Sequence, residues 1–112
     1  MSLEKYESTI QACLDCAMRC ESCSSYCLSE HEIQVMTRCI ELTKNCAAMC
    51  ILTARFLASG SEFVVPACNL CSEICDVCAE ECDRHYMDYC KDCAQSCRDC
   101  ADACRKIALE YV

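Results

Sequence analysis

The sequence predicts an all-α protein, a single domain over residues 1–112 that forms an antiparallel up-down-up-down four-helix bundle with a Cys-lined core. Two observations support this prediction. Eighteen of the 112 residues are Cys, and most of them follow one another at alternating steps of three and four residues. The chain has only one Gly and one Pro, so it lacks the turn residues that a loop-rich disulfide scaffold or a β-fold needs.

The cysteines form four groups, and three of the groups share the motif C-x2-C-x3-C-x2-C-x3-C. The mean step of 3.5 residues is the heptad period of one helical face, with a cysteine at every inward position. A strand would require a period of two, so strands are excluded in these segments. The cysteines are Cys13, Cys16, Cys20, Cys23 and Cys27, then Cys39, Cys46 and Cys50, then Cys68, Cys71, Cys75, Cys78 and Cys82, and finally Cys90, Cys93, Cys97, Cys100 and Cys104.

The second group is a diluted form of the same repeat. Continuing the rhythm of three and four residues on both sides of its three cysteines gives a seam in which the remaining positions are small or apolar. That seam consists of Met36, Cys39, Thr43, Cys46, Cys50, Thr53 and Leu57.

Helix boundaries follow from the seams and from the few turn residues. We expect helices over residues 3–29, 32–58 and 86–110, and a third helix that has Pro66 in its first turn and reaches about residue 83. Ser59-Gly60-Ser61 is the expected break, with Gly60 just beyond a helix end. The connections around His31 and His85 are short, so neighbouring helices should be antiparallel. Each seam of about 15 residues would line a core roughly 20 Å long.

Composition and charge restrict the compartment and the partners. The formal charge of −8 and the absence of a basic patch argue against nucleic acid as a partner. No secretory signal is visible at the N-terminus, and no run approaches 18 apolar residues, so we expect no membrane association and a cytoplasmic location. In that reducing compartment, cysteine patterns indicate metal or redox chemistry more often than disulfides.

The seams themselves favour binding of soft metal ions. Cysteine can pack as a small hydrophobic residue, but eighteen cysteines, fifteen of which fill three seams completely, exceed what packing requires. Thiolates select Cu(I), Zn(II) or iron–sulfur clusters. Zn(II) with four unshared thiolates carries a charge of −2, whereas one Cu(I) per thiolate leaves no net charge to bury. Side chains three and four residues apart can converge on one ion, so an inner cysteine could bridge two ions. Copper therefore ranks first, zinc second and a cluster third.

Two further alternatives remain open at this stage. The C-x2-C pairs could belong to a thiol oxidoreductase, although they lie mid-helix rather than at a helix N-terminus. The chain could also be a structural interaction domain that takes up no metal. No Gly-rich phosphate loop or Ser/His/Asp set indicates an enzyme, and the carboxylates fall mainly between Cys positions, where they should face water.

On its repeated motif and its sparser second seam, nearly the whole chain resembles the bacterial cytosolic copper storage proteins. The resemblance implies a preformed bundle that loads many Cu(I) ions, about one per cysteine, without catalytic turnover. It also implies a homotetramer and an entry mouth with His and Met at one end of the bundle. Copper chaperones or small-molecule thiols are then the expected partners in copper transfer.

The residues at the two ends of the predicted core differ. At the end with the turns near residues 30 and 85, the seams continue into both histidines and two methionines, which can bind copper. We expect an entry site there, with the larger role for Met36 and His85 and a smaller one for His31 and Met87. At the other end, the seams reach a hydrophobic plug that offers copper no good ligand. The plug consists of Tyr6, Leu57, Val64, Ile107 and Tyr111.

The second helix is apolar on more than its cysteine face. One stripe runs through Ile33, Ile40, Ala47 and Ala54, and another through Val35, Leu42, Met49 and Phe56. A helix that is apolar nearly all round is buried on more than one side. We therefore expect this helix to contribute an oligomer interface, the alternative being packing within one protomer.

Overall fold

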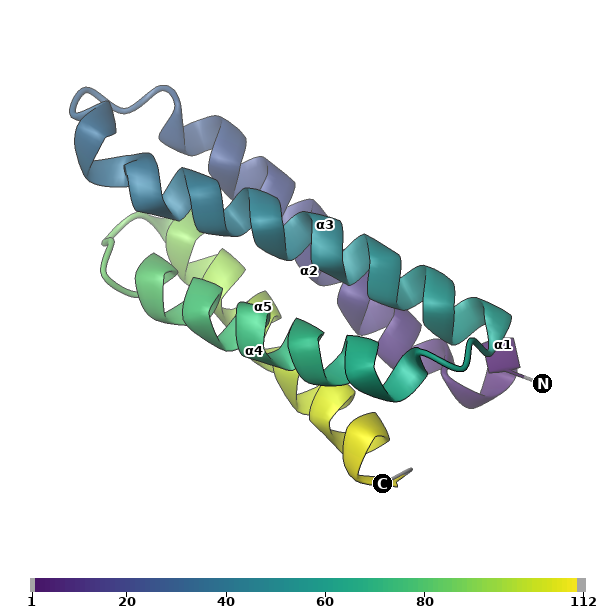
Figure 1. Ribbon diagram of the computed structural model, residues 1–112. Coiled ribbons are helices and arrows are strands. Elements are labelled where there is room, and N and C mark those ends of the chain that lie inside the picture. Colours follow the sequence, from purple (N-terminus) through teal and green to yellow (C-terminus); the bar gives the residue numbers. More distant parts are fainter. Residues whose placement is uncertain (1, 111–112) are drawn as a thin grey trace.

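The computed structural model describes residues 2–110 and is helical throughout, with no strand in that range. Its elements are α1 (Ser2–Lys5), α2 (Glu7–Cys27), the 3₁₀-helix η1 (Ile33–Met36), α3 (Thr37–Ser59), α4 (Val64–Cys82) and α5 (Asp88–Glu110). The four long helices lie side by side in an elongated bundle of 47 × 19 × 18 Å (Figure 1). Helix α3 packs against α2 and α4, and α5 packs against the same two helices. The predicted four-helix bundle is confirmed.

Both short turns, between α2 and α3 and between α4 and α5, lie at one end of the bundle, and the chain termini lie at the other (Figure 1). The turns are closed by backbone hydrogen bonds between residues three apart, such as Glu30 N–H to the Cys27 carbonyl and His85 N–H to the Cys82 carbonyl. No left-handed residue is needed in such a turn, which explains how the chain turns there without glycine.

The helix boundaries depart from the sequence prediction at three places. The first predicted helix is interrupted at Tyr6, where φ −107° and ψ 11° leave the helical region and separate α1 from α2. The second begins with the tighter turn of η1 rather than with α-helix, and the fourth begins at Asp88 instead of residue 86. These are terminal turns, where backbone donors and acceptors have no partner within the helix, so the heptad pattern does not determine them.

The signals from Gly60 and Pro66 are confirmed. Gly60 takes the left-handed conformation with φ 66° and ψ 37°, and its N–H and that of Ser61 donate to the Leu57 and Phe56 carbonyls, which closes the C-terminus of α3. Pro66 is the third residue of α4. The N–H that proline lacks would have had no helical partner at that position.

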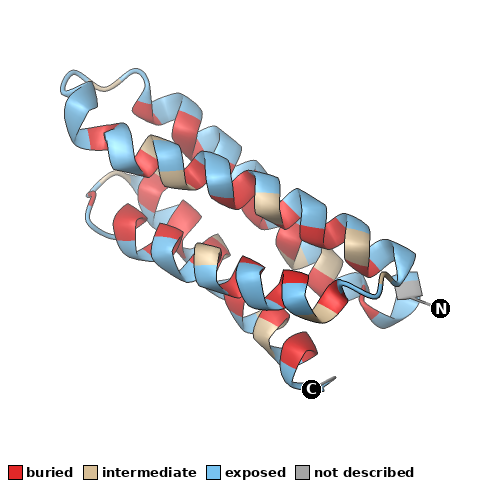
Figure 2. Cartoon of the chain, viewed as in Figure 1, coloured by how far each residue is buried: buried red, intermediate tan, exposed pale blue. Residues whose placement is uncertain are grey.

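The core consists of the predicted seams. All eighteen cysteines are fully buried, and the buried positions form stripes along the inner faces of the four helices (Figure 2). The seam positions of α3 that are not cysteine, Met36, Thr43, Thr53 and Leu57, are buried as well. Among residues 2–110, no helix is both long and apolar enough to cross a lipid bilayer.

Candidate metal centre

Every cysteine of the chain is a free thiol. The shortest sulfur–sulfur separation, between Cys46 and Cys75, is 3.6 Å, far longer than a disulfide bond of about 2.05 Å. The sequence argument against a disulfide scaffold is therefore confirmed. Complete burial of the thiols also removes the exposed nucleophile that a thiol oxidoreductase needs.

The close sulfur–sulfur contacts run mainly between helices. Cys16 of α2 lies 3.8 Å from Cys46 of α3 and 3.7 Å from Cys97 of α5, measured between Sγ atoms. Cys50 of α3 lies 3.8 Å from Cys75 of α4. Only one contact of this kind joins two cysteines of the same helix within the described range, Cys46 to Cys50 at 4.0 Å. The C-x3-C pairs along one helix, which the motif predicts, are nevertheless part of these clusters, because each of the five four-sulfur groups named below contains one such pair.

These contacts gather the sulfurs into groups of four whose Sγ atoms all lie within 4.8 Å of one another. Neighbouring groups share members: Cys16 and Cys46 belong to two groups, and so do Cys20 and Cys97. Five of the groups are Cys13/Cys71/Cys100/Cys104, Cys16/Cys46/Cys50/Cys75, Cys16/Cys20/Cys46/Cys97, Cys20/Cys78/Cys93/Cys97 and Cys23/Cys27/Cys39/Cys90. The prediction that inner cysteines can bridge two ions therefore has a geometric basis.

Burial in the core disfavours the charged thiolate, and the thiols of Cys27 and Cys68 show the effect. Burial raises the pKa of Cys27 to about 11, and the adjacent sulfur of Cys39 adds to the shift. The pKa of Cys68 is raised as well, through its hydrogen bond with Cys104 and through burial. No Lys or Arg side chain is buried in the described part of the chain, so no fixed cation inside the core compensates thiolate charge.

Helix α3 carries two threonines where the other helices have cysteine, and their hydroxyls differ in hydrogen bonding. Thr43 Oγ1 donates to the Cys39 carbonyl at 2.7 Å, which satisfies the hydroxyl within its own helix. Thr53 Oγ1 is buried without a hydrogen-bond partner. Both side chains are fully buried and fill seam positions of the core.

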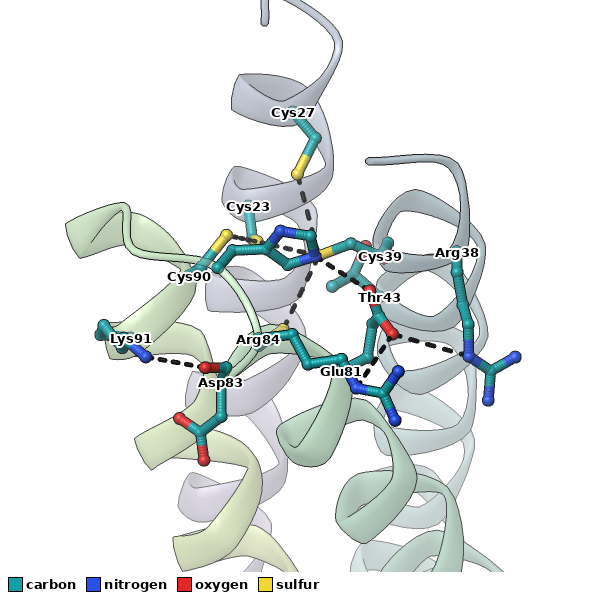
Figure 3. Close-up of polar contacts among 12 residues, drawn as sticks. Cys23, Cys27, Arg38, Cys39, Thr43, Glu81, Asp83, Arg84, Cys90 and Lys91 are labelled. Carbon is teal, nitrogen blue, oxygen red and sulfur yellow. Dashed lines mark hydrogen bonds and ion pairs between the residues drawn. The ribbon is translucent and has the colours of Figure 1, made fainter. Parts of the chain in front are cut away.

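The outermost thiols lie beneath the two short turns. The sulfurs of Cys23, Cys27, Cys39 and Cys90 point toward one another from α2, α3 and α5 (Figure 3). Cys39 is 3.8 Å from Cys27 and 4.0 Å from Cys23, and its sulfur also lies 3.9 Å from that of Cys82 on α4. All four long helices thus contribute a thiol to this end of the core.

The four residues predicted for an entry site line one pocket above these thiols. The pocket has a volume of about 440 Å³, and its wall includes His31, Met36, His85 and Met87. Met36 and His85 are buried, Met87 is half-buried and His31 is exposed. The structure therefore brings together the four residues that the sequence predicted for the entry site. Met36 and His85, for which the sequence predicted the larger role, are the two buried ones.

Glu81 is a residue at this end that sequence reasoning missed. Its side chain is buried, with Oε2 2.9 Å from Nε2 of His85 and Oε1 3.6 Å from Nε of Arg38 (Figure 3). The expectation that carboxylates face water is therefore wrong at this position. A usable signal was its place directly beside Cys82 at the end of a helix and four residues before His85 in the following turn.

The opposite end of the core is closed by apolar side chains, as predicted. Tyr6, Leu57, Val64 and Ile107 are all buried there, and Leu57 is completely inaccessible. Tyr111, the fifth predicted member of the plug, lies outside the described residues. The two ends of the thiol core thus differ in chemistry: one is lined by imidazole and thioether, the other by hydrocarbon and a phenol.

A four-helix bundle filled with overlapping groups of free thiols defines a storage protein for soft metal ions. Residues 2–109 match the family model of the copper storage proteins, and the chain belongs to that family.

The Cu(I)-bound copper storage protein BsCsp3 is 36% identical, with a TM-score of 0.89 over 96% of this chain and 99% of that one. A cytosolic copper storage protein of Streptomyces lividans, solved with five coppers, is 32% identical, with a TM-score of 0.91 over 96% of this chain and 95% of that one. The cysteine-rich protein YhjQ of Bacillus subtilis (strain 168) is 38% identical over 72 residues, which are 63% of this chain and 67% of that protein.

Proposed function

We propose that the thiol core stores Cu(I) in the cytoplasm as thiolate-bridged clusters, at about one ion per cysteine and without chemical turnover. The observation that carries the proposal is the sharing of cysteines between adjacent four-sulfur groups, as for Cys16, Cys20 and Cys97. Shared thiolates let ions occupy consecutive positions along the core. Free thiols persist in a reducing compartment, and the Streptomyces lividans relative is cytosolic.

Geometry alone does not separate copper from zinc. With Zn–S bonds of about 2.3 Å, a tetrahedral zinc site has its sulfurs about 3.8 Å apart, so one isolated group of four would also suit zinc. Charge separates them, because several Zn(II) ions among eighteen thiolates would leave many negative charges in a core without a buried Lys or Arg. Cu(I) at one ion per thiolate leaves no net charge. Relatives of this chain bind Cu(I), in one structure at 10 copper equivalents.

The test is metal loading of the reduced protein without oxygen. Cu(I) and Zn(II) are titrated in separate samples, and bound metal is measured after gel filtration together with the near-ultraviolet thiolate-to-metal absorption. We expect Cu(I) binding to saturate near 18 ions per chain, one for each cysteine. Saturation at four or five ions of either metal would show tetrathiolate sites instead and would contradict the proposal.

We further propose that copper enters and leaves through the pocket at the turn end. The pocket lies at the end of the bundle where the chain leaves Cys27 and Cys82, and its thioether and imidazole groups bind Cu(I) without first releasing a thiol proton. Met36 and His85 receive the larger role because they are buried at the base, and His31 and Met87 the smaller one. A copper chaperone or a small-molecule thiol would exchange copper at this pocket.

We also propose that α3 takes part in a homotetramer. Of its two apolar stripes, Ala47 and Ala54 are buried within the protomer, whereas Val35 is exposed and Leu42 is half-buried. Met49 and Phe56 continue this second stripe as half-buried side chains packed only partly against the core. A partner subunit covering this stripe would bury the remaining apolar area.

A further inference from the structure

The two carboxylate oxygens of Glu81, at the turn end of the bundle, have different partners. Glu81 follows the inward position Cys78 by three residues and precedes Cys82, yet its side chain is only 7% exposed. Acidic side chains are almost never this buried unless they are paired. Oε2 faces Nε2 of His85 at 2.9 Å, whereas Oε1 faces two arginines. The side chain thus has specific partners rather than a packing role alone.

The two arginines hold the carboxylate in place from different elements. Nε of Arg38, at the start of α3, is 3.6 Å from Oε1, and Nε of Arg84, in the turn after α4, is 3.9 Å away (Figure 3). Both guanidinium groups extend toward solvent, with side chains 62% and 66% exposed. A carboxylate next to two guanidinium groups acts as a hydrogen-bond acceptor at both oxygens. The group facing Oε2 must therefore be a donor.

This requirement determines which nitrogen of His85 carries the proton. Nε2 has to be the N–H group that donates to Glu81, so in the neutral ring Nδ1 keeps the free lone pair. Nδ1 has no hydrogen-bond partner among residues 2–110. It is also absent from the fully buried polar atoms in that range that lack a partner, which are Ser24 Oγ and Thr53 Oγ1, so Nδ1 is accessible from outside the core. His85 lines the entry pocket together with Met36 and Met87, so the lone pair has access to an incoming ion.

We propose that Glu81 is a positioning residue for copper entry: it fixes the ring and tautomer of His85 so that Nδ1 is the atom that binds Cu(I). The inference rests on the proposed entry role of His85. Metal-binding histidines generally donate their second ring N–H to a carboxylate or carbonyl, which sets the ring orientation and makes the free nitrogen more basic. Here the carboxylate of Glu81 supplies that second group.

The alternative role for Glu81 is structural, as a tie between α3, α4 and the turn through Arg38 and Arg84. The two roles differ in what substitution changes. A structural tie affects the stability of the turn, whereas a positioning residue affects the tautomer of His85 and the rate of copper uptake. Glutamine separates them further, because its carbonyl oxygen would face the two arginines and its NH2 group would face Nε2 of His85, which must then accept, so that the ring proton moves to Nδ1.

The experiment compares Glu81→Leu, Glu81→Gln and His85→Ala with the control Glu80→Gln, which removes one exposed carboxylate from the neighbouring position. The imidazole nitrogens of the metal-free protein are observed by ¹⁵N NMR, and Cu(I) uptake is followed by stopped flow. We expect a single Nε2–H tautomer in the wild type, the Nδ1–H tautomer in Glu81→Gln, and a mixture in Glu81→Leu. Uptake by Glu81→Leu should slow about tenfold, as in His85→Ala, with the same final capacity, and Glu80→Gln should match the wild type.

Each outcome separates this inference from the entry proposal on which it rests. Slow uptake by His85→Ala together with wild-type uptake and an unchanged tautomer in Glu81→Leu would overturn the positioning role and leave the entry role intact. Wild-type uptake by His85→Ala would overturn the entry role and the inference with it. A second measurement needs no variant: a crystal structure of the wild type with one or two equivalents of Cu(I) should show copper at Nδ1 of His85, and copper at Nε2 would overturn the inference.

Discussion

Cys46 of α3 and Cys75 of α4 bring their sulfur atoms to 3.6 Å, the shortest thiol–thiol separation in the described part of the chain. Cys46 also lies within 3.8 to 4.0 Å of Cys16, Cys97 and Cys50. One side chain of the helix with the fewest cysteines therefore links sulfurs from all four long helices. The sparse seam of α3 thus supplies the centre of the sulfur network.

Loss of this central thiol should cost more copper than loss of a peripheral one. We expect Cys46→Ala to lower the Cu(I) capacity by about two ions, because Cys46 belongs to two four-sulfur groups. The matched control is Cys68→Ala, whose thiol interacts with that of Cys104 but belongs to none of the five groups named above, and which should lose about one ion. Each substitution should cost about 1 kcal/mol of folding stability. Capacity measured by anaerobic titration would contradict this if both variants lost the same amount.

The metal-free protein should already be folded. Neutral thiols pack as small apolar groups, and the turns and helix ends are closed by hydrogen bonds that need no ion. Circular dichroism of reduced protein without metal should therefore show a mostly helical chain with a cooperative thermal transition. A coil spectrum that becomes helical only after Cu(I) is added would show folding coupled to metal binding, as in small zinc domains.

Stability of the metal-free protein should fall at alkaline pH. The pKa of Cys27 is about 11 in the folded protein, against an ordinary value of about 9, so folding favours the neutral thiol. That contribution is fully present below pH 9 and is lost as the pH rises from 9 to 11. The melting temperature of reduced protein should drop through this window, and less so in Cys27→Ala. The Cu(I)-loaded protein, whose thiols are already deprotonated, should not show the drop.

The proposed entry pocket predicts a kinetic defect without a capacity defect. Replacing Met36 with Leu and His85 with Ala should slow both loading and removal of Cu(I) about tenfold or more, because the ligands above the outermost thiols are lost while every thiol remains. Exchange with a chromophoric chelator measures both rates. Tyr6→Ala at the plugged end is the comparison variant. If it accelerated loading while the pocket variant loaded normally, copper would enter from the other end.

An oligomer formed through α3 should dissociate when its outer stripe is charged. Leu42→Glu places a carboxylate in the stripe formed by the exposed Val35 and the half-buried Met49 and Phe56. We expect sedimentation to show a tetramer for the wild type and smaller species for Leu42→Glu, with helicity unchanged. Glu41→Gln, at an exposed neighbouring position, should leave the assembly as it is. A monomeric wild type would contradict the proposed interface.

The sequence alone determined the helices, their inward faces and the chemical difference between the two ends. The heptad spacing of the cysteines is a local property of each helix, and a helix with one apolar face must bury that face. The sequence therefore predicted which residues are buried without knowledge of the neighbouring helices. The signals at Gly60 and Pro66 are equally local, since each reflects the backbone of a single residue.

Only the tertiary structure decided which sulfurs meet. The motif brings two sulfurs of one helix together, and each of the five four-sulfur groups named above contains such a pair. The axial register and rotation of α3 and α5 add sulfurs from other helices, as where Cys16 lies beside Cys46 and Cys97, which are 30 and 81 residues away in sequence. Burial of Glu81 has the same origin, because Arg38 reaches it from another helix. The periodicity of cysteines within one helix contains no information on the axial position of that helix relative to a neighbouring helix. The axial position is set by packing of side chains across the bundle, and it determines which thiols of the four helices form the shared groups of four.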